Sequence, residues 1–143
     1  MTATYRVRKS NNAQVINDLQ KQLYDSDELP VFAMDDREWW VVWHGEVSVA
    51  YAALRITGSC AWFSICGVVE AHRGHGLQKR LITARLAFAK KKGIASVYTY
   101  TINGNHPSAR SLIHKGFVPC TPPAEHYGCW AGVRDVLYWK REL

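Results

Sequence analysis

The chain has 143 residues, a formal net charge of +6, 48% hydrophobic residues and 21% charged residues. This length and composition predict a globular chain with one core and exclude a disordered polymer, so we expect a single domain over residues 1–143. The positive charge favours an anionic partner, which includes phosphates, acidic peptides and nucleic acids, without choosing among them.

The first half of the chain predicts a strand, a helix and an antiparallel meander. Tyr5–Arg8 alternates like a short strand, and a helical pattern begins near Asn11 and ends before Pro30. Three apolar or alternating runs follow, separated by turns at His44-Gly45 and Thr57–Ser59: Trp39–Trp43, Val47–Ile56 and Cys60–Val69.

The second half predicts alternating helices and strands. Leu77–Lys92 has a helical pattern with Leu77, Leu81, Ala84 and Phe88 on one face, and Gly93 follows its end. The remaining elements are a strand at Ser96–Ile102, a short helix at Ser108–Lys115, and strands at Phe117–Cys120 and Val133–Lys140. Residues 121–132 form one long irregular loop, a kind of segment that is often functional.

No run is long enough to cross a bilayer, and the N-terminal "MTATYRVRKS" lacks the apolar core of a signal peptide. We therefore expect a cytoplasmic protein without a membrane partner. The cysteines show no CxxC spacing and are expected to be reduced, mostly buried thiols: Cys60, Cys66, Cys120 and Cys129. His72 and His75 have no second ligand pair nearby, so no metal site is expected.

The stretch Arg73-Gly74-His75-Gly76 lies between a predicted strand and a predicted helix. Glycines let a ligand approach the backbone, and the first N–H groups of a helix favour a phosphate. One interpretation is therefore a pyrophosphate cradle to which Arg73 adds a fixed charge. The alternative is a tight turn that needs glycine for its own geometry. The stretch is neither a Walker loop nor a complete GxGxxG fingerprint.

A second stretch, "NGNHPSARSLIHKGF", runs from Asn103 to Phe117. Alone it describes a capped helix returning to a strand. Together with "VVEAHRGHGL" and the order of elements, it resembles the GNAT (N-acetyltransferase) superfamily. The resemblance implies an α/β (α+β) fold with one mixed six- to seven-stranded sheet flanked by helices. Arg73 and Gly76 fill the first and fourth places of the family pattern [Q/R]-x-x-G-x-[G/A], whereas Gln78 departs from it at the sixth.

The resemblance implies acetyl-CoA (coenzyme A) as the cofactor. Backbone N–H groups from Arg73 to Lys79 would hold the pyrophosphate, and the strands around Val69 and Ser96 would splay apart to admit the pantetheine arm. Asn105 would contact that arm or order the turn after it. The cofactor-binding residues expected in this way are Val68, Val69, Arg73, Gly74, His75, Gly76, Leu77, Gln78, Lys79, Asn105 and Ser108.

The catalytic groups are less well marked. The family's tyrosine, a general acid, would stand where this chain has Leu112, and the strand Cys60–Val69 carries no glutamate to act as a base. Direct transfer needs no cysteine nucleophile. Three loop residues remain as proton donors or acceptors, Glu125, His126 and Tyr127, and a solvated loop is the alternative reading of them.

The leading hypothesis is an acetyl-CoA-dependent N-acetyltransferase whose acceptor is a protein lysine, a protein N-terminus or a small amine. A non-catalytic acyl-CoA-binding module is the first alternative, because the usual tyrosine and glutamate are missing. A basic nucleic-acid binder is the second, although only Lys90–Lys92 forms a basic run and no nucleic-acid motif accompanies it. The state of assembly, monomer or homodimer, stays open.

Overall fold

A computed structural model describes residues 4–24, 36–102, 104–121 and 136–143. Its seven strands form one sheet in the order β1-β2-β3-β4-β5-β7-β6, as expected for the GNAT-like fold class. Neighbouring strands are antiparallel except for β4 and β5, which are parallel. The elements are β1 (Tyr5–Ser10), α1 (Ala13–Tyr24), β2 (Glu38–His44), β3 (Val47–Thr57), β4 (Cys60–Val68), the 3₁₀ turn η2 (Glu70–His72), α2 (Leu77–Lys91), β5 (Ser96–Ile102), α3 (His106–His114), β6 (Val118–Pro119) and β7 (Val136–Glu142).

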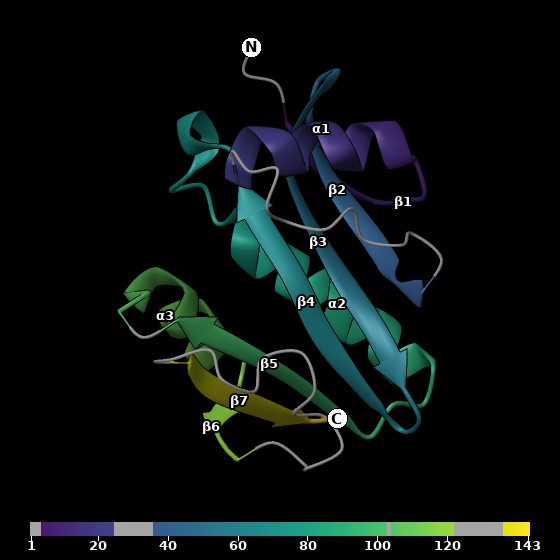
Figure 1. Ribbon diagram of the computed structural model, residues 1–143, viewed down its shortest axis with the longest axis vertical. Helices are drawn as coiled ribbons and strands as arrows, with labels where there is room; N and C mark the ends of the chain where they lie inside the picture. Colours follow the sequence, from purple (N-terminus) through teal and green to yellow (C-terminus); the bar gives the residue numbers. More distant parts are fainter. Residues whose placement is uncertain (1–3, 25–35, 103, 122–135) are drawn as a thin grey trace.

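The sheet is covered on both faces, and β2 shows why its sequence is an unbroken apolar run. Trp40 and Val42 belong to the core beneath α2, while Trp39 and Val41 belong to the core beneath α1. Alternate residues of a strand point to opposite faces, so a strand between two helical layers needs apolar residues at every position. Figure 1 shows α1 crossing in front of the strands and α2 lying behind them.

The predicted meander is confirmed, since β2, β3 and β4 pair antiparallel in chain order. The turns between them place Gly45 and Gly58 at positive φ. The first helix is also confirmed, and the Asn12 side-chain oxygen accepts the backbone N–H groups of Gln14 and Val15 at 3.1 and 3.3 Å. Such a side-chain acceptor satisfies N–H groups that the first turn leaves open.

The inward face of α2 differs from the predicted one. Leu77 and Leu81 are buried as expected, but Ala84 and Phe88 are only partly buried. Arg85 is buried instead, with 2% of its surface exposed. A pattern that ranks residues by hydropathy excludes an arginine from the core, so the sequence did not predict this position.

The β4–β5 ladder is short. It contains the pairs Cys60↔Ser96, Ala61↔Val97 and Trp62↔Tyr98, and no further pair joins these two strands. Of the two strands expected to splay apart, the one that carries Ser96 has this residue at the paired end of the ladder. The strands part beyond Tyr98, where the Thr99 hydroxyl donates to the Phe63 carbonyl at 3.3 Å.

The last strands are shorter or shifted relative to prediction. β6 is limited to Val118–Pro119, and Phe117 turns into the core against Phe63, with ring centroids 5.6 Å apart. Pro119 has no N–H to donate, which weakens the ladder at that point. β7 runs to Glu142, and residues 133–135 of the predicted strand lie outside the described residues.

Candidate active site

The predicted glycine turn, Arg73–Gly76, lies between the end of β4 and the start of α2. Gly74 and Gly76 have φ values of +83° and +74°, and Gly76 is the residue immediately before the helix. A side-chain Cβ at either glycine would meet no atom within 4 Å. The two glycines are therefore required by backbone conformation, and the space above them is open to a ligand.

The first turn of α2 presents backbone donors to this space. The Arg80 N–H donates to the Gly76 carbonyl at 3.1 Å and starts the helical hydrogen bonds. The N–H groups of Leu77, Gln78 and Lys79 come before it, and helix geometry gives them no acceptor within the helix. The first turn carries no acidic residue. Its partial positive charge and free donors are suited to an anion.

The end of β4 places a backbone edge beside the same turn. The Val69 N–H donates to the Val49 carbonyl of β3 at 2.8 Å. Because neighbouring residues of a strand face opposite edges, Val68 turns its backbone groups away from β3. Its carbonyl accepts the Arg73 Nε–H at 3.0 Å. Arg73 therefore contacts the edge of β4, and because its side chain is exposed it also contributes positive charge to the surface of the turn.

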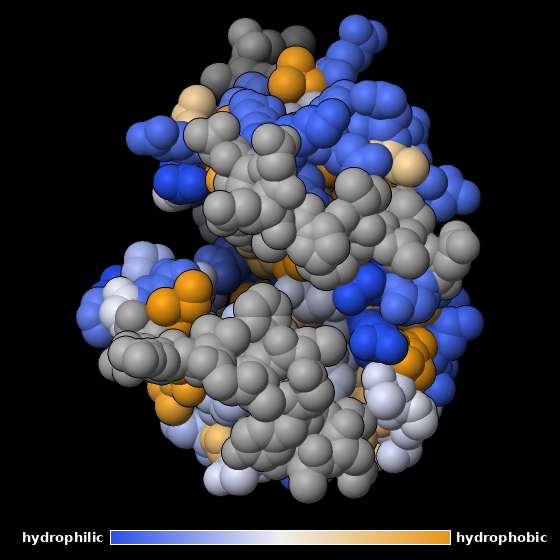
Figure 2. All heavy atoms as spheres, in the orientation of Figure 1, coloured by the Kyte–Doolittle hydropathy of each residue, from blue (hydrophilic) through white to orange (hydrophobic). Residues whose placement is uncertain are grey.

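Figure 2 shows the surface hollowed at the left of the molecule, between the end of β4 with η2 above and α3 below. The hollow lies on the side on which β4 and β5 diverge in Figure 1. An extended ligand in it would reach both the edge of β4 and the first turn of α2.

Gln78, which departs from the family pattern, joins two helices. Its side-chain amide donates to the Ser108 hydroxyl at 3.0 Å. The Ser108 backbone N–H in turn donates to the side-chain oxygen of Asn105, the cap of α3, at 3.3 Å. The three residues form a chain of hydrogen bonds between the first turns of α2 and α3. The structure thus brings together two predicted site residues, Gln78 and Ser108, that lie 30 positions apart in the sequence.

His72 and His75, immediately before the turn and within it, contact the Tyr5 ring, and the sequence did not predict this contact. The Tyr5 hydroxyl and His72 Nδ1 share a hydrogen bond of 3.0 Å, and the Tyr5 ring stacks on His44 at 4.6 Å. The Tyr5 and His75 rings lie 5.5 Å apart. On α2, Arg80 donates to the Tyr5 carbonyl at 3.2 Å. Contacts over such sequence separations leave no local pattern by which they could have been predicted.

The proposed proton-transfer residues Glu125, His126 and Tyr127 lie outside the described residues. Leu112 is 4% exposed and packs in the core, so it leaves no polar group at the place of the family's tyrosine. The Ser64 Oγ of β4 is buried and has no hydrogen-bond partner among the residues that the structure describes. Ser64 is the one hydroxyl-bearing residue of β4.

Three of the four cysteines lie within the residues that the structure describes. Among the residues described, Cys60, Cys66 and Cys120 form no disulfide and are partly buried, less buried than predicted, while Cys129 lies outside those residues. Among the residues described, no group of three or more His, Cys, Asp or Glu side chains is placed to hold a metal ion. No helix in the described ranges has the length and apolar character needed to span a membrane.

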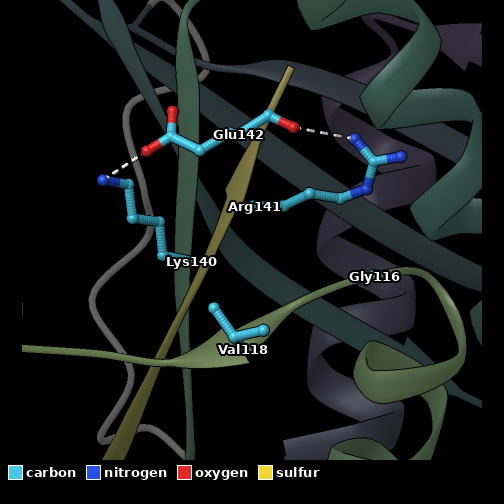
Figure 3. A pocket seen from close by; sticks show the side chains of 5 residues that line it. All are labelled: Gly116, Val118, Lys140, Arg141 and Glu142. Atoms are coloured by element: carbon cyan, nitrogen blue, oxygen red, sulfur yellow. Dashed lines mark hydrogen bonds and ion pairs between the residues drawn. The ribbon is translucent and has the colours of Figure 1, made fainter.

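A separate pocket of about 570 Å³ lies at the β6–β7 edge (Figure 3). It is lined by Gly116, Val118, Lys140, Arg141 and Glu142, none of which is a predicted site residue. Its charges are already paired, since Lys140 forms an ion pair with Glu142 and Arg141 Nη1 donates to the Glu142 carbonyl at 3.1 Å. Hydrogen bonding to Glu142 raises the pKa of Lys140, so this pair stays charged at neutral pH.

The fold places a glycine turn and a helix N-terminus beside the open edge of β4, and comparison with known proteins identifies the class of protein. Residues 5–117 match the model of the acetyltransferase (GNAT) family. The chain therefore belongs to this family, as the sequence predicts. The family is one of acetyltransferases.

Several solved structures share the fold at low sequence identity. An IAA acetyltransferase from Bacillus cereus is 17% identical, with a TM-score of 0.80, over 98% of this chain and 100% of that one. A Bacillus subtilis acetyltransferase in complex with CoA is 18% identical, with a TM-score of 0.77, over 98% and 99%. The ribosomal-protein-S18-alanine N-acetyltransferase of Escherichia coli is 12% identical, with a TM-score of 0.75, over 97% and 94%. A comparison with curated protein sequences gave no match.

Proposed function

We propose that this protein transfers the acetyl group of acetyl-CoA directly to an amine, with the cofactor bound between β4 and β5. The observation that supports the proposal is the position at which β4 and β5 separate. The β4–β5 ladder stops after Trp62↔Tyr98, and the open edge of β4 runs to Val68, beside the glycine turn and the first turn of α2. The pantetheine arm would lie along this edge and the pyrophosphate on the helix N-terminus.

Each group at the turn has a part in binding. Backbone N–H groups from Gly74 to Lys79 would donate to the pyrophosphate, whereas the Arg73 N–H donates to the Glu70 carbonyl at 3.2 Å. The main chain of Val68 would hydrogen-bond the pantetheine amides, with Arg73 moving its guanidinium from the Val68 carbonyl toward a phosphate. Gln78, Asn105 and Ser108 hold α3 against α2 on the other side of the arm.

Transfer follows from placing an amine above the thioester. The amine lone pair attacks the acetyl carbonyl, a C–N bond forms, the C–S bond breaks, and the sulfur leaves as a thiolate that takes up a proton. The amine must enter neutral, so a base accepts one proton before or during attack. We assign this proton transfer to the loop residues Glu125, His126 and Tyr127, since an imidazole can accept a proton near neutral pH and a tyrosine hydroxyl can return one.

The acceptor is an amine of a protein lysine, a protein N-terminus or a small molecule. The net charge of +6 favours an acceptor that carries negative groups near its amine over a polyamine, because like charges repel. The Escherichia coli protein is named for an alanine of ribosomal protein S18, and the Bacillus cereus protein for IAA. The shared fold thus accommodates different acceptors, and the choice must be measured.

The first experiment is calorimetric titration of the purified protein with acetyl-CoA, desulfo-CoA and adenosine diphosphate. Saturable binding of acetyl-CoA that weakens when the pantetheine arm is removed would support a cofactor bound along β4. Absence of binding by all three would contradict the proposal.

The second experiment follows thiol release from acetyl-CoA with a panel of acceptors. The panel contains an acidic peptide with a free N-terminus, a lysine peptide blocked at its N-terminus, spermidine and a small aromatic amine. Turnover with any of them, above hydrolysis without an acceptor, supports transfer. Tight binding of acetyl-CoA without turnover would favour the non-catalytic binding module instead.

A further inference from the structure

Arg85 is a buried charge that the cofactor turn does not use. It lies on α2 with 2% of its surface exposed. Burial lowers its pKa to about 10, which still leaves the guanidinium charged at neutral pH. A buried charge is costly unless hydrogen bonds compensate it, so its partners indicate what it does.

Those partners come from three elements. The Nε–H donates to the Leu81 carbonyl of the same helix at 3.2 Å, and Nη1 donates to the Ala53 carbonyl of β3 at 3.1 Å. The guanidinium carbon lies 3.8 Å from the centre of the Phe63 ring of β4. The guanidinium also hydrogen-bonds the Cys66 side chain, whose pKa is raised by burial against the opposing effect of Arg85.

The contacts on the strands surround an irregularity in β4. Ala52 pairs with Cys66 and Leu54 pairs with Phe63, so Ser64 and Ile65 together oppose the single residue Ala53. This is a β-bulge, in which the ladder is locally disrupted and the strand bends. Phe63 and Cys66, on its two sides, both pack against the core beneath α2, whereas Ile65 packs against the core beneath α1.

Arg85 therefore holds both sides of the bulge and the carbonyl opposite to it. The bulge begins two residues beyond Trp62, the last residue of β4 that pairs with β5. The bend thus lies where the strands part, and it sets the course of the open edge that ends at Val68. The same helix that carries Arg85 begins at the glycine turn.

We propose that Arg85 is a positioning residue for the cofactor: it fixes the bulge of β4, and so the open strand edge, relative to the N-terminus of α2. The proposal rests on the proposed binding of acetyl-CoA along β4. A ligand that spans the edge of β4 and the glycine turn binds well only if these two parts are held at a fixed distance from each other. A ligand that occupies only the turn does not.

The test compares two ligands in two variants. Acetyl-CoA spans both parts of the site, whereas adenosine diphosphate reaches only the turn. In Arg85→Met we expect the Kd for acetyl-CoA to rise about tenfold, the size of effect that the loss of a well-placed hydrogen bond produces. The Kd for adenosine diphosphate should stay within about twofold, since the turn is intact. General destabilisation of the fold would weaken both ligands alike.

Arg85→Lys keeps the charge but loses the planar fork that reaches two carbonyls, and we expect an intermediate Kd for acetyl-CoA. Arg55→Met is the matched control, because Arg55 is an exposed arginine of β3 that lies next to Leu54 and contacts Asp36 at 3.6 Å. Its ratio of the two Kd values should equal that of the wild type. Thermal unfolding checks that each variant is folded.

The outcomes separate this proposal from the proposed function. A wild-type protein that binds neither ligand overturns the proposed function, and the positioning role with it. Wild-type binding with an unchanged ratio in Arg85→Met overturns only the positioning role. If Arg85→Met does not fold, Arg85→Lys decides, and a wild-type ratio in that variant rejects the proposal. Unfolding of both variants also rejects it, because Arg85 would then serve stability alone.

Discussion

The Gln78 side-chain amide donates to the Ser108 hydroxyl across 3.0 Å, and this bond joins the first turns of α2 and α3. It gives a physical role to Gln78, which departs from the sixth place of the family pattern [Q/R]-x-x-G-x-[G/A]. A small residue at this place would leave the Ser108 hydroxyl without that donor. The larger Gln78 side chain thus supports the site from the side, through the helix that Asn105 caps.

We expect Gln78→Ala to weaken acetyl-CoA binding by about fivefold, because one neutral hydrogen bond contributes about 1 kcal/mol. Ser108→Ala should have a similar effect, and the double variant should be little worse than either single one. The measurement is a double-mutant cycle on the calorimetric Kd. Fully additive losses would show that the bond does not act in binding.

Gly76→Val should abolish acetyl-CoA binding, because a side chain at φ +74° is strained and would fill the open space above the turn. A left-handed conformation costs a residue other than glycine about 1–2 kcal/mol. Gly58→Val is the matched control, since Gly58 has φ +62° and equally open surroundings in the β3–β4 turn. It should lose similar stability and keep cofactor binding. Loss of binding in both variants would mean that strain alone is responsible.

Arg73→Ala should weaken binding of both acetyl-CoA and adenosine diphosphate, by about three- to tenfold at low salt. Its guanidinium now donates to the Val68 carbonyl and is exposed enough to turn toward a phosphate. Arg73→Lys should restore most of the affinity for adenosine diphosphate, which depends on charge. Equal affinity of the alanine variant and the wild type for both ligands would remove Arg73 from the site.

His126→Ala should lower kcat and flatten its rise between about pH 6 and 8 if His126 takes the proton of the acceptor, since histidine titrates in this range. The Kd for acetyl-CoA should not change. Tyr127→Phe should lower kcat with little effect on that rise. A pH profile of kcat identical to that of the wild type in His126→Ala would assign proton transfer to water or to another residue.

Ser64→Ala should keep or raise the stability of the free protein, because the Ser64 Oγ is buried and no described residue hydrogen-bonds it. An unsatisfied buried polar group costs about 1–3 kcal/mol. Ser111→Ala is the control: Ser111 is also buried, but its hydroxyl donates to the Pro107 carbonyl at 3.1 Å. Chemical denaturation should show a loss only for Ser111→Ala. A clear loss for Ser64→Ala would reveal a bonded partner.

The elements with strong local patterns were predicted well. The strand Ser96–Ile102 was predicted without error, and the second long helix ends one residue earlier than expected, at Lys91. Both have a period that matches their own geometry and a glycine or turn at the end. The glycine turn was predicted for the same reason, since its signal lies within four residues.

The features that were missed depend on distant partners. The bulge at Ser64 and Ile65 moves the residues that follow it to the opposite face of the sheet. The sequence around it is a nearly continuous apolar run, so no change in a polar–apolar alternation marks the bulge. The burial of Arg85 depends on carbonyls and rings of β3 and β4. The bond between Tyr5 and His72 crosses 67 positions. None of these leaves a periodic signal in the sequence.

The short β4–β5 ladder has a consequence for the behaviour of the free protein. Unpaired strand edges are sites where another chain can add a strand, and proteins with such edges at the margin of a sheet risk aggregation. Here the edge of β4 from Ser64 to Val68, which forms no ladder with β5, lies inside the sheet, with α3 across the hollow of Figure 2. Because β4 is an interior strand of the sheet, its open edge is less accessible to a strand of another chain than the edge of a marginal strand would be. The edge is thus kept available for one extended ligand without offering a seed for fibres.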